Sequence, residues 1–227
     1  MKQKFTILFD LDGTLVDTAP DLMLAHNHVM KKFGYPTKST EDIRNLVGKG
    51  AGALIGRSIW GQAKKEFSKV LDDKIKDEMV KEFINFYGKN INNESTLING
   101  VKEFLIWCKE QNISMAVCTN KQERLSNDLL KKIGIYDFFE YVAGSDTFDY
   151  CKPDPRHLTN VVEILDGDVK KTIMIGDSET DANAAKAAEI PVILLENGYT
   201  EKNTTEIYHN HLIKDFVGIE KIITKYL

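Results

Sequence analysis

Short apolar segments alternate with longer amphipathic segments along most of this chain. The apolar segments are rich in β-branched residues and lie at residues 5–9, 113–118, 141–143, 172–175 and 192–195. Patterns typical of amphipathic helices lie at residues 101–110, 122–133, 156–165 and 180–189. Because the apolar segments do not alternate with polar residues, they are typical of strands that are buried on both faces. Strands that alternate with helices in this way predict an α/β protein with a parallel sheet and right-handed crossovers.

One long part of the chain breaks this alternation. No strand pattern occurs between residue 17 and about residue 94, where the sequence is typical of charged helices, as over residues 63–87. We therefore expect an all-helical insertion over residues 17–94 and a core made of residues 1–16 and 95–227. Residues 15–21 and the polar segment 90–95 are expected to connect the two parts. Near the end of the chain, residues 210–213 indicate a last short strand and residues 217–226 a closing helix.

The composition excludes several classes of protein. Of the 227 residues, 42% are hydrophobic, which is enough to build a large core. The 30 Lys and Arg against 34 Asp and Glu give a net charge of −4, so no overall positive field attracts nucleic acid or anionic lipid. No apolar segment approaches the length of about 18 residues that a membrane-spanning helix needs. The three cysteines form no C-x-x-C pair, which favours reduced thiols in a cytoplasmic protein.

The first predicted strand ends in two carboxylates, in the sequence Phe9-Asp10-Leu11-Asp12-Gly13-Thr14. Residues two apart on a strand point to the same side, and Gly13 allows the backbone to turn after them. Both carboxylates can therefore face one pocket. A simple Asp-Gly turn would account for Asp12, but it leaves Asp10 as a buried charge, which is unfavourable without a cation or hydrogen bonds.

A second acidic cluster also follows an apolar strand, in the sequence Gly176-Asp177-Ser178-Glu179-Thr180-Asp181. If a helix begins near Ser178, Asp177 and Asp181 lie together at its start, where acidic residues also serve as ordinary helix caps. In an open parallel sheet, this cluster and the first one meet beyond the carboxyl ends of the strands. Carboxylates gathered there repel one another unless a cation is bound, and a ligand set of oxygens alone points to Mg²⁺.

Two further strand ends carry groups that are suited to binding an anion. Thr119 and Asn120 follow one predicted strand and offer a hydroxyl, an amide and the backbone N–H groups of a helix start. Lys152 follows the next predicted strand, in the sequence Lys152-Pro153-Asp154-Pro155. Taken singly, a Thr-Asn pair is a common helix cap and a lone lysine is usually a surface charge. At one edge of the same sheet, we expect these residues to bind phosphate.

Taken together, these four motifs resemble those of the haloacid dehalogenase-like hydrolase superfamily, over essentially the whole chain. They are D-x-D-G-T, then Thr-Asn, then Lys-Pro, then G-D-x-x-x-D, each after its own predicted strand. The resemblance implies a Rossmann-like three-layer core with a parallel sheet, a bound Mg²⁺ ion and an aspartyl-phosphate intermediate. It implies that Asp10 attacks the phosphoryl group and that Asp12 serves as general acid and then as general base.

The same resemblance implies which residues bind the metal and the phosphate. The implied ligands of Mg²⁺ are Asp10, the backbone carbonyl of Asp12, and Asp177, with Asp181 in an accessory position. The implied phosphate-binding residues are Thr119, Asn120 and Lys152, which would neutralise the phosphoryl oxygens.

Finer features point to one branch of the superfamily. Asp12 is typical of phosphatases and phosphomutases, because the dehalogenases lack this acid and ion-pumping ATPases carry lysine in its place. The insertion resembles the helical cap that one subfamily carries between its first and second motifs. Residues 17–21 and 46–51 and the pair Gly198-Tyr199 resemble bacterial phosphoglycolate phosphatases, so 2-phosphoglycolate is the expected substrate. The chain departs from them at residues 152–157, which read Lys-Pro-Asp-Pro-Arg-His where those enzymes often read K-P-x-P-x-P.

A cap that closes over the strand ends would exclude water and complete the site. Three basic residues of the insertion are candidates for binding the substrate carboxylate, although an exposed helix charge is the simpler explanation for each taken singly: Lys49, Arg44 and Arg57. The expected partner is a small phosphorylated molecule, with no nucleic acid and no membrane, and the chain is expected to be a monomer or a homodimer.

The sequence leaves other functions open beside a Mg²⁺-dependent phosphomonoesterase. A sugar phosphomutase would form an isomer in the presence of a bisphosphate activator, and a phosphonatase would use a lysine of the cap, for which Lys49 is available. A non-catalytic protein that binds a phosphorylated ligand has no need for both Asp10 and Asp12. An interaction protein could use the charged residues 63–87, but those charges are more simply explained as a solvated helix face.

Overall fold

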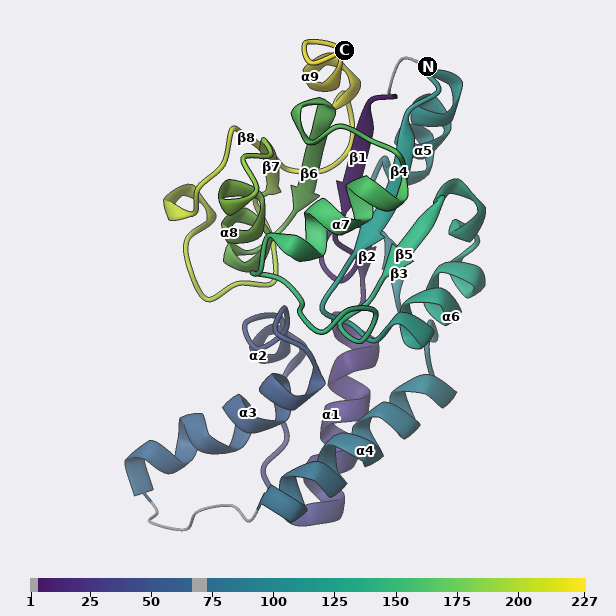
Figure 1. The fold of residues 1–227 in the computed structure, drawn as a ribbon. Helices are drawn as coiled ribbons and strands as arrows, with labels where there is room; N and C mark the ends of the chain where they lie inside the picture. The colour runs from purple at the N-terminus through teal and green to yellow at the C-terminus, as the bar shows by residue number, and fades with distance from the viewer. Residues whose placement is uncertain (1–3, 67–72) are drawn as a thin grey trace.

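The computed structural model of the protein describes residues 4–66 and 73–227 (Figure 1). Within these residues, one six-stranded sheet runs through the core. In spatial order its strands are β5 (Tyr141–Ala143), β4 (Ser114–Cys118), β1 (Thr6–Phe9), β6 (Thr172–Gly176), β7 (Val192–Leu195) and β8 (His211–Ile213). Every neighbouring pair of strands is parallel, as the alternation of strands with helices predicts.

The central strand β1 fixes which residues come together at the edge of the sheet. All four of its residues are buried, as expected for a parallel strand covered on both faces. Phe9, its last residue, pairs with Val117 of β4 and with Ile175 of β6. The residues that follow these three strands therefore emerge side by side at one edge.

Helices cover both faces of the sheet, which gives three layers (Figure 1). Ile7 and Phe9 point to one face, which is covered by α5 (Val101–Glu110), α6 (Glu123–Ile133) and α9 (Glu220–Ile223). Leu8 points to the other face, which is covered by α7 (Arg156–Ile164) and α8 (Glu179–Ala187). The aromatic ring of Phe9 packs edge to face against Phe104 of α5, at a centroid distance of 6.2 Å. The expected Rossmann-like three-layer core is confirmed.

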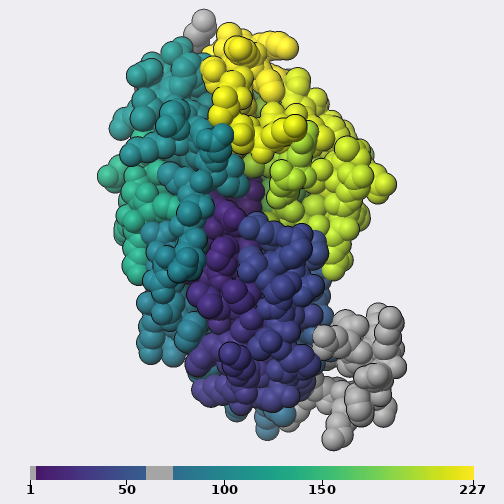
Figure 2. Space-filling model, turned by 180° about the vertical axis from the view of Figure 1, so that it is seen from behind, coloured from purple at the N-terminus to yellow at the C-terminus, as the bar shows by residue number. Residues whose placement is uncertain are grey.

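Among the residues that the structure describes, four more helices form the inserted cap beyond the edge of the sheet, at the end of the molecule away from both termini (Figures 1 and 2). They are α1 (Ala19–Phe33), α2 (Thr40–Arg44), α3 (Ala51–Glu66) and α4 (Asp73–Lys89). Helix α1 packs against α2 and α4, and α3 packs against α4. Residues 63–87, expected to be helical throughout, therefore fall in two helices that pack against each other, and residues 67–72 lie outside the described part.

The connection from the core to the cap is more regular than the sequence predicts. Residues 15–21 were expected to form a linker, but β2 (Val16–Asp17) pairs with β3 (Thr96–Leu97) in an antiparallel ribbon, and α1 already begins at Ala19. The ribbon was missed because a strand of two residues shows no periodicity. The buried carboxylate of Asp21 accepts hydrogen bonds from the backbone N–H groups of Glu94 and Ser95 and from the Ser95 hydroxyl. The outgoing and returning connections are thereby joined.

The last part of the core confirms one expectation and shortens another. The expected strand at residues 210–213 is present as β8. The closing helix α9 is shorter than the expected 217–226: it begins only after Gly218, whose φ of +81° is not helical, and it ends at Ile223. The described part of the chain also contains three short 3₁₀ segments, η1 (Tyr136–Phe138), η2 (Val169–Lys171) and η3 (Thr204–Glu206). None of the described helices is long and apolar enough to cross a membrane.

Candidate active site

Polar residues from three strand ends meet beneath the cap. Asp10 directly follows β1, Thr119 follows β4 and Asp177 follows β6. The sheet hydrogen bonds continue past the strands, since the backbone N–H of Asp10 donates to the Ile175 carbonyl at 2.9 Å. All three polar residues are buried. Their positions are therefore set by the parallel sheet itself.

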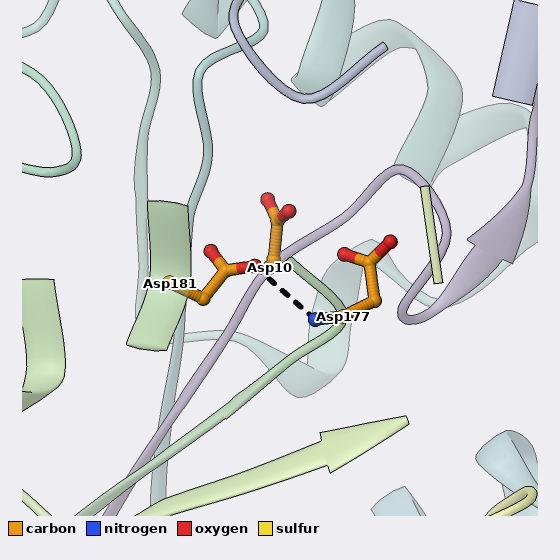
Figure 3. A group of neighbouring side chains, drawn as sticks. All are labelled: Asp10, Asp177 and Asp181. Atoms are coloured by element: carbon orange, nitrogen blue, oxygen red, sulfur yellow. Dashed lines mark hydrogen bonds between the residues drawn. The ribbon is translucent and has the colours of Figure 1, made fainter. Parts of the chain in front are cut away.

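Asp10, Asp177 and Asp181 form a cluster of buried carboxylates (Figure 3). One carboxylate oxygen of each lies within 4.8 Å of those of the other two. Burial is the main cause that raises the pKa of Asp10 to about 6, while the positive charge of Lys152 opposes it. Burial, and then the charges of Asp181 and Asp10, raise the pKa of Asp177 well above its ordinary value. Without more positive charge, this cluster is electrostatically unfavourable.

The donor atoms of the cluster fit a hard divalent cation. All three residues offer carboxylate oxygens, which are the ligands that Mg²⁺ and Ca²⁺ prefer. Asp10 Oδ1 is buried and makes no hydrogen bond of normal geometry, and its charged neighbour is Lys152, whose Nζ lies 3.0 Å away. A bound cation would also relieve the repulsion between the carboxylates. These residues can therefore hold a metal ion.

Lys152 contributes a fixed positive charge to the same cluster. Its side chain is only 1% exposed, and its Nζ lies 3.0 Å from Asp10 Oδ1 and 2.6 Å from Asp181 Oδ1. Burial alone would lower the pKa of Lys152, but the charges of Asp10 and Asp181 outweigh burial and raise this pKa above its ordinary value. Lys152 is therefore positively charged at neutral pH.

Asp181 is both a helix cap and a member of the cluster. Its Oδ2 accepts hydrogen bonds from the backbone N–H of Asp177, as Figure 3 shows, and from the N–H and hydroxyl of Ser178. These bonds form a capping box at the start of α8. The other oxygen of Asp181 holds Lys152. The two interpretations of this acid, helix cap and site residue, therefore apply to the same side chain.

The carboxylate of Asp177 is held from two sides. Thr14 donates a hydrogen bond from its hydroxyl to Oδ1 at 3.0 Å, and Tyr199 donates from its backbone N–H to Oδ2 at 2.6 Å. Gly13 passes close by with a φ of +82°, and a Cβ atom at this position would lie 2.3 Å from Asp177 Oδ2. Glycine at residue 13 therefore serves both the turn and the close approach of the second acid.

Asp12 lies outside the buried cluster, although it is only two residues from Asp10. Its carboxylate accepts a hydrogen bond from the Thr18 hydroxyl at 2.7 Å. It also accepts two hydrogen bonds from Lys121 Nζ, at 2.8 and 3.0 Å. The two acids of the first motif therefore face the same cavity in different surroundings.

Lys121 is a site residue that sequence reasoning missed. Its side chain is 6% exposed, and its Nζ lies 4.3 Å from the centroid of the Tyr87 ring on α4. Burial lowers its pKa, but the charge of Asp12 outweighs this and keeps the pKa above its ordinary value. A lysine directly after Thr119 and Asn120 is indistinguishable from a surface charge in sequence. The one signal in the sequence that could have indicated Lys121 is Asp12 itself: an acid in a buried site, unlike one in an exposed turn, needs a positive charge beside it.

Thr119 and Asn120 lie between the acids and the cap. The Thr119 side chain is buried at the strand end, and its hydroxyl accepts a hydrogen bond from the backbone N–H of Lys121. The Asn120 amide donates to the Gly48 carbonyl in the cap at 3.1 Å and to the Lys152 carbonyl at 2.9 Å. Asn120 therefore joins the cap to the segment that carries Lys152.

The three basic candidates of the cap lie in different places. Arg44 makes two hydrogen bonds to the carboxylate of Asp17, at 2.9 and 2.7 Å. Arg57 donates to the carbonyls of Leu46 and Asn45 and pairs with Glu201. Lys49 is about half exposed, lies 3.6 Å from Glu179 and lines the cavity above the acids. Of the three, only Lys49 is among the residues described as lining that cavity.

A cavity of about 270 Å³ lies between the cap and the strand ends. Its floor is polar and contains the acids of the first motif and the residues after β4, namely Asp10, Asp12, Thr119, Asn120 and Lys121. Its other walls come mainly from the segment before α3 and from helices α1, α3, α4 and α6. The arrangement can hold a small molecule with an anionic group next to Asp10.

Known proteins are similar to this chain in sequence over most of their length. Residues 7–195 match a family model described as haloacid dehalogenase-like hydrolase. A phosphoglycolate phosphatase of Mesorhizobium japonicum is 38% identical over 210 residues, which are 92% of this chain and 90% of that protein. A phosphoglycolate phosphatase of Caulobacter vibrioides is 39% identical over 216 residues, which are 95% of this chain and 89% of that protein.

The three-dimensional fold is also shared with a solved structure. The crystal structure of a predicted phosphoglycolate phosphatase from Haemophilus somnus superposes with a TM-score of 0.90 and 31% sequence identity. The match covers 98% of this chain and 99% of that one. The family model, the similar sequences and the similar fold all point to the same family as the acidic motifs at the strand ends. This chain belongs to the haloacid dehalogenase-like hydrolase family.

Proposed function

We propose that this protein is a Mg²⁺-dependent phosphomonoesterase and that 2-phosphoglycolate is its substrate. The observation that carries the proposal is the separation of the two acids of the first motif. Asp10 lies in the buried cluster beside Lys152, whereas Thr18 and Lys121 hold Asp12 outside it. Phosphoryl transfer to a carboxylate needs a nucleophile with a positive charge close by and a separate acid for the leaving group. The phosphoglycolate phosphatases that match about nine-tenths of the chain support this choice of substrate.

Asp10 is the nucleophile in this proposal. One of its oxygens attacks phosphorus, the bond from phosphorus to the alcohol oxygen breaks, and an acyl phosphate forms. Asp12 donates a proton to the leaving alcohol and then accepts a proton from the water that hydrolyses the acyl phosphate. Asp12 suits this role because it lines the cavity and lies outside the carboxylate cluster.

The remaining acids and the anion-binding residues support these two steps. The proposed ligands of the metal are Asp10, Asp177 and the backbone carbonyl of Asp12, and Asp181 assists by holding Lys152. When bound, the metal neutralises the phosphoryl oxygens and allows an anionic substrate to approach the acids. The residues proposed to surround the phosphoryl group are Thr119, Asn120 and Lys152, and Lys152 supplies a positive charge there.

The helical insertion acts as a movable cap in this proposal. Residues 17–94 form the cap, residues 1–16 and 95–227 form the catalytic core, and closure of the cap excludes water from the site. Lys49 is the cap residue proposed to meet the carboxylate of the substrate, because it lines the cavity. Arg44 and Arg57 are already paired with Asp17 and Glu201 and serve to hold the cap in place.

The direct test measures phosphate release from 2-phosphoglycolate by the purified protein with Mg²⁺. We expect turnover that stops when a chelator removes the metal, and at least a roughly 1,000-fold loss of kcat in Asp10→Asn. Asp128→Asn on α6 removes a carboxylate that is 42% exposed, and it serves as the matched control with unchanged kcat.

Other outcomes separate the alternative functions. Formation of an isomer with a bisphosphate activator and without net phosphate release would identify a phosphomutase. Trapping of beryllofluoride on Asp10 is expected for an enzyme with an acyl phosphate, whereas a non-catalytic binding protein does not form that adduct. If the protein releases no phosphate from any member of a broad panel of phosphomonoesters, the proposed function is wrong.

A further inference from the structure

Part of the wall of the cavity beneath the cap is apolar. Six apolar side chains from four helices form this wall, and we call them the apolar wall: Leu22, Leu54, Val80, Phe83, Ile84 and Leu125. 2-Phosphoglycolate is a two-carbon acid with a negative charge at each end. Such a molecule gains little from apolar contacts, because the hydrophobic effect scales with the apolar area removed from water.

The apolar wall itself carries no positive charge that could bind the carboxylate of a substrate. Among the described lining residues, the cations are Lys49 and Lys121. Lys121 is already bound to Asp12 and lies over the Tyr87 ring. Lys49 belongs to the segment before α3, whereas half of the apolar wall comes from α4. A carboxylate is therefore favoured near Lys49, and an uncharged group is favoured against α4.

The size and shape of the cavity agree with a larger organic group. Its volume of about 270 Å³ is close to the lower end of cavities that enclose drug-sized ligands, about 300 Å³. Phe83 and Tyr87, which both line the cavity, lie with their rings nearly parallel, at an interplanar angle of 3° and a centroid distance of 6.1 Å. Aromatic side chains such as these offer favourable contacts to another ring.

We propose that the apolar wall is a subsite for the leaving group, and that the enzyme also hydrolyses phosphomonoesters of primary alcohols that carry an aromatic ring. This inference rests on the proposed phosphatase function and extends its substrate class. The chemistry is unchanged: the bond from phosphorus to the alcohol oxygen breaks, water supplies the new oxygen of phosphate, and the alcohol leaves with a proton. The phosphoryl group stays at Asp10 while the ring is buried against α4.

The first measurement compares kcat/KM for 2-phenylethyl phosphate with kcat/KM for ethyl phosphate. Both esters release a primary alcohol of similar acidity, so a difference between them reports on the organic group rather than on the leaving-group chemistry. We expect 2-phenylethyl phosphate to have a kcat/KM that is roughly tenfold higher or more, because its ring leaves water on binding. 2-Phosphoglycolate is measured alongside as the substrate of the proposed function.

The second measurement changes the wall. Val80 and Ile84 line the cavity and are only partly buried, so the double variant Val80→Ser, Ile84→Ser leaves the fully buried core intact. We expect this variant to lose about fivefold of the preference for 2-phenylethyl phosphate over ethyl phosphate. Ile75→Ser is the matched control, because Ile75 lies on the same helix, is 40% exposed and is not among the lining residues. Thermal melts establish that both variants are folded.

Each result decides between the two proposals. If the wild type hydrolyses 2-phosphoglycolate but shows no preference for the aromatic ester over ethyl phosphate, the subsite is refuted and the phosphatase function stands. If the preference is present but survives in the folded double variant, the apolar wall is not its cause and the inference is also wrong. Release of phosphate from none of the esters contradicts the proposed function itself.

Discussion

Asp10 and Asp12 are only two residues apart, but they lie in different surroundings because they contact different side chains. Asp10 follows a buried strand and is surrounded by Lys152, Asp177 and Asp181, which leaves it in a crowded anionic cluster. Asp12 is turned toward Lys121 and is stabilised by that ion pair and by the hydrogen bond from the Thr18 hydroxyl. Each acid of the first motif thus has its own buried lysine. A nucleophile and a separate acid can therefore lie two residues apart in the chain.

Lys121 is predicted to position Asp12 for proton transfer. Lys121→Met keeps most of the side-chain volume but removes two hydrogen bonds to Asp12, so the carboxylate loses its fixed orientation. We expect kcat for 2-phosphoglycolate to fall by about 10- to 100-fold, with a smaller change in KM, because Lys121 is not among the residues proposed to bind the phosphoryl group. Steady-state kinetics measure this split between kcat and KM. Lys131→Met, an exposed lysine on α6, is the control, and an equal loss in both variants would contradict the prediction.

At the scale of elements, the cap is joined to the core by specific polar contacts. The ribbon of β2 and β3 carries the two connections, and Asp21 ties the start of α1 to the returning chain. Tyr199 reaches from the core to the start of the cap, where its hydroxyl donates to Asp17 and accepts from the backbone N–H of Ala19. The same residue holds Asp177 through its backbone N–H. The cap and the acid cluster are thus linked through one tyrosine.

Asp21 is predicted to stabilise the base of the cap. Asp21→Ala leaves the partly buried N–H groups of Glu94 and Ser95 without their charged acceptor, which is expected to lower the free energy of unfolding by about 1–2 kcal/mol. Asp21→Asn retains one acceptor oxygen and is expected to lose less. Urea denaturation measures both values, with Asp77→Ala on the exposed face of α4 as the control. If Asp21→Ala is as stable as that control, these hydrogen bonds do not hold the connections together.

At the scale of the whole molecule, the parallel sheet explains why the sequence predicts so much of the site. Parallel strands end at one edge, so residues that follow β1, β4 and β6 must meet there, whatever their separation along the chain. Asp10, Thr119 and Asp177 could be brought together on this ground alone. The helical insertion could be predicted because seventy-odd residues without a strand pattern interrupt the alternation.

The remaining features depend on side-chain direction, which periodicity does not encode. Lys121 looks like a surface charge in sequence, and only the fold shows it buried against Asp12. Arg44 was a candidate for binding substrate, but in the structure it pairs with Asp17. Long basic side chains can reach several partners from one backbone position. The partner that each of them contacts is therefore set by how the cap packs against the core.

The buried cluster of acids is expected to destabilise the folded protein when its carboxyl groups are ionised. The ordinary pKa of Asp10 is 3.8, and burial raises it to about 6 in the folded protein. A carboxyl group with a raised pKa contributes its full stability below the unfolded value, and this contribution is lost as pH rises toward the folded value. Without divalent cations, the wild type is therefore expected to lose roughly 2–3 kcal/mol of unfolding free energy between about pH 4 and pH 6 through Asp10.

Asp10→Asn tests this by removing the charge while keeping the shape of the side chain. In chelator at pH 7, we expect the inactive variant to melt several degrees above the wild type. Mg²⁺ should raise the Tm of the wild type, because it binds the folded state, and should raise the Tm of Asp10→Asn by less. Asp12→Asn is the matched control with the opposite sign, since it breaks the ion pair with Lys121 and should melt below the wild type. If Asp10→Asn also melts below the wild type in chelator, Asp10 is stabilised by Lys152 more than it is destabilised by burial.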